Sequence, residues 1–325
     1  MDSFTVIKVF DYIFKNSKII IVEIEMTKPK KRFREILSET RIPITYEIGS
    51  PRGYKVSQYI QAISSFRDKL SAVNIPDNPL ATLKISSIAY ANVIMNSLGI
   101  EVIPHVTCRD RNLLALQSDI LGAYLLGIRN LFIIGGDRAS GKLKDLKQVW
   151  EVGPLQFCEI VKMMNDGYAY CGEFVEMDGK TNFFVGGALI FSRENEVDTL
   201  LRKIKAGFDF FQSQITFNVE NVLKFFEEVE KRDLHLSTPI LIGLTPISSK
   251  QMLERIVKIP YVEISEELRG RLKRSRNIAE ESVKLCLEIA DELKSNLSYK
   301  YKLGFHVMPL GQDEIGGKIV EGLGG

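Results

Sequence analysis

Short apolar runs and helical patterns alternate along most of the chain. Eight runs rich in Val, Ile and Phe have the length of β-strands, and most are largely apolar, as strands covered on both faces should be. Between them lie segments with apolar residues at three- and four-residue steps, for example Val219–Val229 and Ser275–Leu293, which predict amphipathic helices. The predicted strands are Pro43–Ile48, Ala72–Pro76, Glu101–Thr107, Asn130–Ile134, Asn182–Leu189, Phe208–Thr216, Pro239–Leu244 and Lys302–Met308.

Strands that alternate with helices indicate parallel pairing and right-handed crossovers. Eight such units predict an α/β protein with a closed (β/α)8 TIM barrel over residues 42–312. An open doubly wound sheet would carry a G-x-G-x-x-G turn after its first strand. The sequence there, Glu47-Ile48-Gly49-Ser50-Pro51-Arg52-Gly53, does not fit that pattern.

Two segments lie outside the predicted barrel. Residues 1–41 contain an amphipathic segment (Phe4–Phe14), a strand-like stretch (Ile19–Met26) and a basic helical piece (Lys28–Ser38). We expect this extension to pack on or beside the barrel as a cap over its floor, and a dimer contact is the alternative. Residues 313–325 are rich in glycine, which predicts a flexible C-terminal tail.

The composition narrows the classes of function. Lys+Arg (43) and Asp+Glu (41) leave a net charge of +2, so there is no global basic field to hold nucleic acid. No apolar run reaches the ~20 residues that span a bilayer, and the N-terminus lacks a signal-peptide pattern. The four cysteines, Cys108, Cys158, Cys171 and Cys286, have no metal-ligand spacing. We therefore expect a cytoplasmic protein with reduced thiols and with no nucleic-acid, membrane or metal partner.

Polar residues gather at the carboxyl ends of the predicted strands, where the chemistry of such barrels takes place. Glu47 lies in an apolar strand, so burial would raise its pKa and make it a general acid, unless it is a solvated or ion-paired glutamate. Asp137 follows Gly135-Gly136, which leaves room for a flat ring, although a turn aspartate is also common. His105 and Gln214 would bind a heterocycle or satisfy neighbours inside the barrel.

Five motifs follow one another along these strand ends. They are Tyr46-Glu47-Ile48-Gly49-Ser50-Pro51-Arg52-Gly53, Ile103-Pro104-His105-Val106-Thr107-Cys108-Arg109-Asp110-Arg111-Asn112, Gly135-Gly136-Asp137, Lys203-Ile204-Lys205-Ala206-Gly207 and Gln212-Ser213-Gln214. Together they resemble the methylenetetrahydrofolate reductase family. Asn74–Pro79 and Leu113–Gly127 are similar to the branch that occurs fused to homocysteine methyltransferases.

The resemblance implies an oxidoreductase of one-carbon metabolism and methionine biosynthesis, with FAD at the barrel mouth and NADH or NADPH as hydride donor. A 5,10-methylene-tetrahydropterin, either tetrahydrofolate or a modified pterin, would be reduced to its 5-methyl form. Glu47 would protonate a nitrogen of its five-membered ring, Asp137 would tune pterin and flavin by its charge, and Gln214 and Gln212 would bind substrate. The implied flavin-binding residues are His105, Gly135, Gly136, Asp137, Gly187, Ala188, Arg202 and Lys203, with the two cations near the pyrophosphate.

Several alternatives stay open. Val22–Pro29 also looks like an acidic strand, which would make Glu25 the acid and give nine strands; the eight-strand count favours Glu47. Two functions are alternatives to the reductase. The chain would then be a barrel that transfers the methyl group of a methyl-pterin, or a non-catalytic pterin-binding subunit that works beside a partner protein. We expect a homo-oligomer with a small-molecule pterin substrate.

Overall fold

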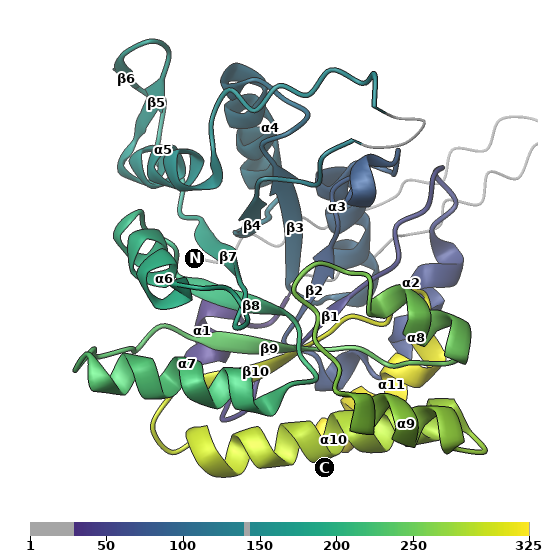
Figure 1. The fold of residues 1–325 in the computed structure, drawn as a ribbon. Coiled ribbons are helices and arrows are strands. Elements are labelled where there is room, and N and C mark those ends of the chain that lie inside the picture. Colours follow the sequence, from purple (N-terminus) through teal and green to yellow (C-terminus); the bar gives the residue numbers. More distant parts are fainter. Residues whose placement is uncertain (1–28, 140–143, 325) are drawn as a thin grey trace, which may run out of the picture.

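Eight parallel strands close a barrel in the computed structural model, which describes residues 29–139 and 144–324 (Figure 1). Hydrogen bonds join the strands in the order β1-β10-β9-β8-β7-β4-β3-β2, and β2 pairs with β1 to close the ring. The TIM-barrel prediction is confirmed, and each predicted strand contains an observed one. The barrel strands are β1 (Ile44–Glu47), β2 (Ala72–Ile75), β3 (Val102–Thr107), β4 (Asn130–Ile134), β7 (Phe184–Leu189), β8 (Phe210–Ile215), β9 (Ile240–Leu244) and β10 (Leu303–Val307).

Helices follow the strands around the outside of the barrel. Asparagine side chains begin several of them: Asn112, Asn218 and Asn277 each accept a hydrogen bond from a backbone N–H of the first turn. Two short 3-10 turns lie at Arg67–Lys69 and Pro79–Ala81. The helices are α1 (Phe33–Glu39), α2 (Ser57–Ser64), α3 (Ser87–Leu98), α4 (Leu113–Leu125), α5 (Pro154–Asp166), α6 (Glu196–Lys205), α7 (Val219–Lys231), α8 (Lys250–Ile256), α9 (Glu266–Arg274), α10 (Ile278–Leu297) and α11 (Asp313–Leu323).

The amino end of the barrel is filled by aromatic rings, one of which comes from α1. Phe33 is fully buried, and its ring centroid lies 6.2 Å from that of Phe184 and 5.3 Å from that of Phe210. The Phe33 backbone N–H donates to the buried Glu101 carboxylate at 3.0 Å, and Arg32 Nη1 donates to it at 3.2 Å. Because Phe184 and Phe210 begin their strands, α1 lies under the barrel floor.

The C-terminal residues pack as a helix, so the prediction of a flexible tail is wrong for residues 313–324. A Cβ on Gly316 would come within 2.8 Å of the Tyr46 hydroxyl, and one on Gly317 within 2.9 Å of the Phe66 ring. Tyr46 Oη also donates to Asp313 Oδ1 at 2.9 Å. These glycines let α11 approach the outside of the barrel closely.

The structure adds elements that the periodicity does not predict. An antiparallel hairpin of β5 (Tyr168–Tyr170) and β6 (Phe174–Glu176) follows α5. Gln117 of α4 both donates to and accepts from the Tyr170 backbone at 2.8 Å, which ties the hairpin to the barrel wall. Two short helices, α8 and α9, precede the predicted helix α10. The described part of Ala139–Gly153 has no helix or strand.

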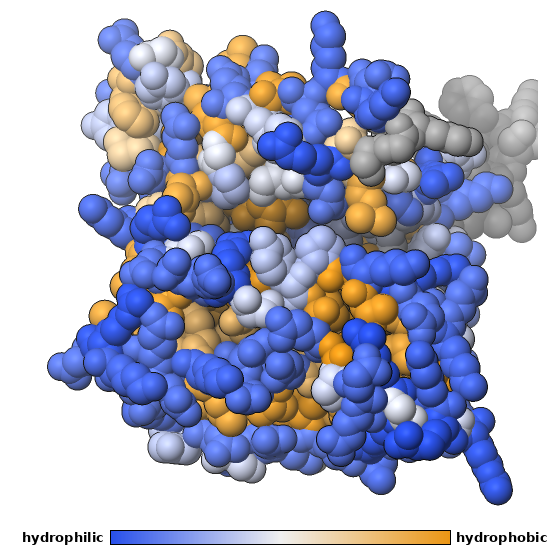
Figure 2. Space-filling view, viewed as in Figure 1, coloured by the Kyte–Doolittle hydropathy of each residue, from blue (hydrophilic) through white to orange (hydrophobic). Residues whose placement is uncertain are grey.

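Some expectations fall on residues that the structure does not describe. Phe4–Phe14, Ile19–Met26 and Glu25 all lie in residues 1–28, outside the described ranges. Among residues 29–139 and 144–324, no helix has both the length and the apolar character to cross a bilayer. Hydrophilic residues cover most of the face in Figure 2, and hydrophobic ones show between them in separate patches.

Candidate active site

Glu47 is the last residue of β1 and faces the inside of the barrel. Its side chain is half-buried and has no hydrogen-bond or ion-pair partner among the described residues. Burial raises the pKa of this carboxyl group to about 7. A carboxylic acid that titrates near neutral pH at the mouth of a barrel can serve as a proton donor.

His105 and Gln212 lie deeper, in a buried chain of polar side chains that crosses the barrel interior. Asn74 Nδ2 lies 3.1 Å from His105 Nε2 and 2.7 Å from Gln212 Oε1. Gln212 Nε2 donates to Asn74 Oδ1 and to Thr45 Oγ1, both at 3.0 Å, and Thr45 Oγ1 lies 2.9 Å from His306 Nδ1. Five strands contribute one residue each.

Burial favours the neutral form of both histidines in this polar chain. Burial lowers the pKa of His105 to about 3. Burial also lowers the pKa of His306 to about 3, with a smaller contribution from His105. No carboxylate pairs with either ring among the described residues. The site therefore holds uncharged imidazoles under a titratable carboxyl group.

Asp137 lies on the exposed loop after β4 and is held from two sides. Its carboxylate accepts from the Leu80 N–H at 2.8 Å, and its backbone carbonyl accepts from Arg109 Nη1 at 3.0 Å. Arg109 is fully buried and also donates to the Asn78 carbonyl at 3.0 Å. Gly136 has φ +87°, and a Cβ there would come within 3.0 Å of the Arg109 side chain. Arg109 thus joins the loops after β2, β3 and β4 under Asp137.

The two glycine pairs, Gly135-Gly136 after β4 and Gly186-Gly187 within β7, have different surroundings. A Cβ on Gly135 would meet only Pro154, at 3.9 Å, although the Gly135 carbonyl accepts from Trp150 Nε1 at 2.7 Å. A Cβ on Gly187 would come within 2.6 Å of the Phe208 ring. Gly135 leaves open space at the mouth, whereas Gly187 is required for packing.

Arg202 and Lys203, the two cations predicted to bind the flavin pyrophosphate, lie in different surroundings. Lys203 Nζ donates to the carbonyl of the half-buried Ala188 at the end of β7. Burial lowers the pKa of Lys203, and the nearby Glu196 partly opposes this. Arg202 lies on the exposed face of α6 and donates to Thr199 Oγ1 at 3.2 Å. Lys203 therefore reaches the barrel mouth, and Arg202 lies in a different, exposed environment.

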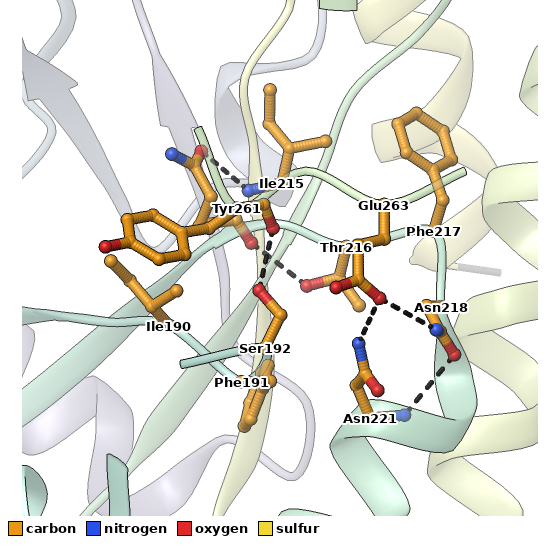
Figure 3. A pocket seen from close by; sticks show the side chains of 11 residues that line it. Ile190, Phe191, Ser192, Ile215, Thr216, Phe217, Asn218, Asn221, Tyr261 and Glu263 are labelled. Carbon is orange, nitrogen blue, oxygen red and sulfur yellow. Dashed lines mark hydrogen bonds between the residues drawn. The ribbon is translucent and has the colours of Figure 1, made fainter. Parts of the chain in front are cut away.

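Gln214 lines a pocket beside the carboxyl ends of β7 and β8 (Figure 3). Gln214 Oε1 accepts from the Ile215 N–H at 2.9 Å, which leaves its amide nitrogen without a partner among the described residues. In the same pocket, the Glu263 carboxylate accepts from Asn221 Nδ2 at 2.7 Å and from Asn218 Nδ2 at 3.2 Å. The other lining residues are Ile190, Phe191, Ser192, Thr216, Phe217 and Tyr261.

Sequence reasoning missed several of these residues for identifiable reasons. Glu263 comes after α8, far from a strand end, and no local pattern marks it. A sequence feature could have identified Thr45, Asn74 and His306. Each is a polar residue at an inward position of an otherwise apolar strand. The described residues hold no group of three His, Cys, Asp or Glu side chains that could bind a metal ion.

Comparison with known proteins gives the family. A sequence model described as methylenetetrahydrofolate reductase matches residues 32–324. This chain belongs to the methylenetetrahydrofolate reductase family. The match includes β1, both glycine pairs and the whole polar chain of the barrel interior.

Several relatives in this family match at low identity. The 5,10-methylenetetrahydrofolate reductase of Salmonella typhimurium is 22% identical over 288 residues, which is 87% of this chain and 91% of that protein. The probable methylenetetrahydrofolate reductase (NADPH) of Caenorhabditis elegans is 22% identical over 65% of this chain. Methylenetetrahydrofolate reductase (NADH) 1 of Zea mays is 25% identical over 56% of it. The matches span 31% of the worm and maize proteins.

One solved structure agrees with the fold over nearly the whole chain. It is an uncharacterized protein from Clostridium thermocellum, described as binding two copies of 5-methyl-5,6,7,8-tetrahydrofolic acid. The two structures superpose with a TM-score of 0.64 at 18% sequence identity, over 89% of this chain and 97% of that one. This likeness supports the barrel architecture.

Proposed function

We propose that this chain is a flavin-dependent reductase that converts a 5,10-methylene-tetrahydropterin to its 5-methyl form. Reduced nicotinamide is the hydride donor, and the relatives named for NADPH and for NADH leave both donors in the proposal. The pterin is tetrahydrofolate or a modified pterin. The observation that carries the proposal is the unpartnered Glu47 carboxyl group, with its pKa of about 7, in a barrel of this family.

The residues at the mouth fit a flat, hydrogen-bonding ring such as a flavin. Gly135 has room beside its Cα where a side chain would be, and His105 Nδ1 has no partner among the described residues. Lys203 supplies a cation at the same end of the barrel, and Ala188 offers a small side chain. Gly187 is less suited, because Phe208 occupies the space beside it. A flavin bound there would supply hydride transfer between the nicotinamide and the pterin.

The chain's own groups account for the rest of the reaction. Glu47, whose pKa of about 7 leaves a large fraction of the carboxyl group protonated at neutral pH, donates its proton to a nitrogen of the five-membered ring, so that the ring opens and leaves an electrophilic carbon. Asp137 holds a negative charge beside the forming cation, at a position fixed by Arg109 and Leu80. The free amide nitrogen of Gln214 donates to the heterocycle edge. The aromatic rings at the amino end close the barrel to water from that side.

The experiment is a comparison of two half-reactions in the purified chain. Visible absorption tests for a flavin, and a colourless protein that does not bind added FAD would overturn the proposal. Glu47→Gln should leave flavin reduction by NADH or NADPH intact and slow pterin reduction at least 100-fold. Glu176→Gln, on the exposed β5–β6 hairpin, is the matched control and should change neither step.

The same assay separates the alternatives. A chain that binds 5-methyltetrahydrofolate but oxidises no nicotinamide, even with an artificial electron acceptor, would be a pterin-binding subunit. Methyl transfer from 5-methyltetrahydrofolate to a thiol, without nicotinamide, would indicate a methyltransferase. Light scattering of the same sample tests the proposed homo-oligomer.

A further inference from the structure

The polar chain inside the barrel has a fixed direction of hydrogen bonding. Asn74 and Gln212 form a reciprocal amide pair, in which each nitrogen donates to the oxygen of the other, at 2.7 and 3.0 Å. The second hydrogen of Asn74 Nδ2 points to His105 Nε2. An amide nitrogen can only donate, so His105 Nε2 must accept and the proton of this neutral ring lies on Nδ1.

The same donor and acceptor rule fixes the hydrogen bonds at the other end of this row of polar side chains. The second hydrogen of Gln212 Nε2 goes to Thr45 Oγ1. The hydroxyl proton of Thr45 then goes to His306 Nδ1, and the His306 proton lies on Nε2. In this orientation every amide and hydroxyl hydrogen of the chain has one acceptor. The amide pair is therefore the element that decides which nitrogen of each histidine carries a proton.

One nitrogen of each histidine ring remains available. His105 Nδ1 and His306 Nε2 have no hydrogen-bond partner among the described residues, and both side chains are buried. His105 lies on β3, whose carboxyl end joins the Arg109 loop under Asp137. Its ring also packs against Phe132, with centroids 4.8 Å apart, which limits its rotation.

We propose that Asn74 and Gln212 are positioning residues, which hold His105 with its proton on Nδ1 so that it presents an uncharged N–H donor to the ring bound in the barrel mouth. The identity of that ring rests on the proposed function. Thr45 and His306 continue the same hydrogen bonds at the far end of the amide pair. A neutral donor can bind a carbonyl oxygen or ring nitrogen without placing a charge beside a hydride-transfer partner.

Nitrogen NMR of the histidine rings tests the inference without any ligand. The sequence has three histidines, and the exposed His235 serves as the internal reference. We expect His105 to show a protonated Nδ1 and a bare Nε2. A ring protonated on Nε2, or on both nitrogens, would overturn the proposal.

Variants test whether the amide decides the tautomer. Asn74→Asp places a carboxylate oxygen against His105 Nε2, so the proton should move to Nε2. Asn165→Asp is the matched control, because Asn165 is a part-buried structural amide that donates to the Phe183 carbonyl at 2.9 Å away from both histidines. The control should leave the His105 spectrum unchanged. An Asn74→Asp protein with the wild-type tautomer would contradict the inference.

Ligand addition tests the direction in which His105 points. FAD and 5-methyltetrahydrofolate are added separately, and their binding is measured by fluorescence or absorbance. We expect one of them to shift the His105 Nδ1–H signal, and Asn74→Asp to bind that ligand about tenfold more weakly, as for one lost hydrogen bond. The control should change its affinity less than twofold. Binding that leaves His105 unmoved overturns the inference, whereas no binding of either ligand overturns the proposed function.

Discussion

Replacing Glu47 by glutamine should stabilise the protein at neutral and alkaline pH. In the folded chain the pKa of Glu47 is about 7, compared with an ordinary value of 4.5. Between these two pH values the folded protein keeps a proton that the unfolded chain has released. The free energy of unfolding therefore falls as pH rises through this window, and the loss is complete above about pH 7. Glutamine has no such proton and lacks this dependence.

The size of the effect follows from the two pKa values. Each factor of ten in proton affinity is about 1.4 kcal/mol, which gives about 3 kcal/mol for the whole window. Glu47 is half-buried, so solvent screens part of this cost. We expect the difference in unfolding free energy between Glu47→Gln and the wild type to grow by about 2 kcal/mol from pH 5 to pH 8.

Urea unfolding at the two pH values measures this difference. Glu101→Gln is the control, because the Glu101 carboxylate accepts from Phe33 N, Arg32 Nη1 and Asn130 Nδ2 at 2.8–3.2 Å. That substitution removes satisfied hydrogen bonds and should destabilise the barrel at both pH values by about 1–3 kcal/mol. An equal effect of Glu47→Gln at pH 5 and pH 8 would refute the reasoning.

Three further predictions concern packing around the site, each measured by urea unfolding. Gly136→Ala should cost about 1–3 kcal/mol, because φ is +87° and the new Cβ meets a buried arginine, whereas Gly53→Ala, with nothing within 4 Å, should be near neutral. Gly186→Ala should cost a similar amount, because its Cβ would lie 2.2 Å from the Phe210 ring, and Phe210→Leu should restore part of the loss. Removal of residues 313–325 should lower stability by several kcal/mol, since α11 covers buried aromatic side chains; an unchanged midpoint would show that the segment contributes no packing.

The strands were predictable because their pattern is local. A run such as Val102–Thr107 is buried at every position, and its apolar character can be read from the sequence alone. The C-terminal helix was not predictable in the same way. Gly316 and Gly317 have the composition of a flexible end, and only their contact with Tyr46 and Phe66, far away in the sequence, gives them a packing role.

The candidate site was predicted in part, because a strand position fixes where a residue lies but not what it contacts. Glu47 and Gln214 were expected at the carboxyl ends of the first and sixth predicted strands, and the structure places them at the ends of β1 and β8. Gly187 was expected to bind the flavin, yet the side chain of Phe208, just before β8, fills the space beside it. Arg202 and Lys203 are adjacent in sequence, but a helix turns successive side chains about 100° apart, so only one reaches the mouth.

The unusual state of Glu47 and the polar chain below it have a common cause. Glu47 and Asn74 are direct partners across the β1–β2 ladder, and both face inward. Asn74 has two amide hydrogens, and both are used, one by Gln212 and one by His105. No amide hydrogen of Asn74 is left to stabilise the Glu47 carboxylate, so burial raises the pKa of Glu47 without an opposing hydrogen bond. The hydrogen bonds that orient His105 therefore leave no Asn74 donor for Glu47, and the two groups that we propose to face the ligand are both linked to this one amide.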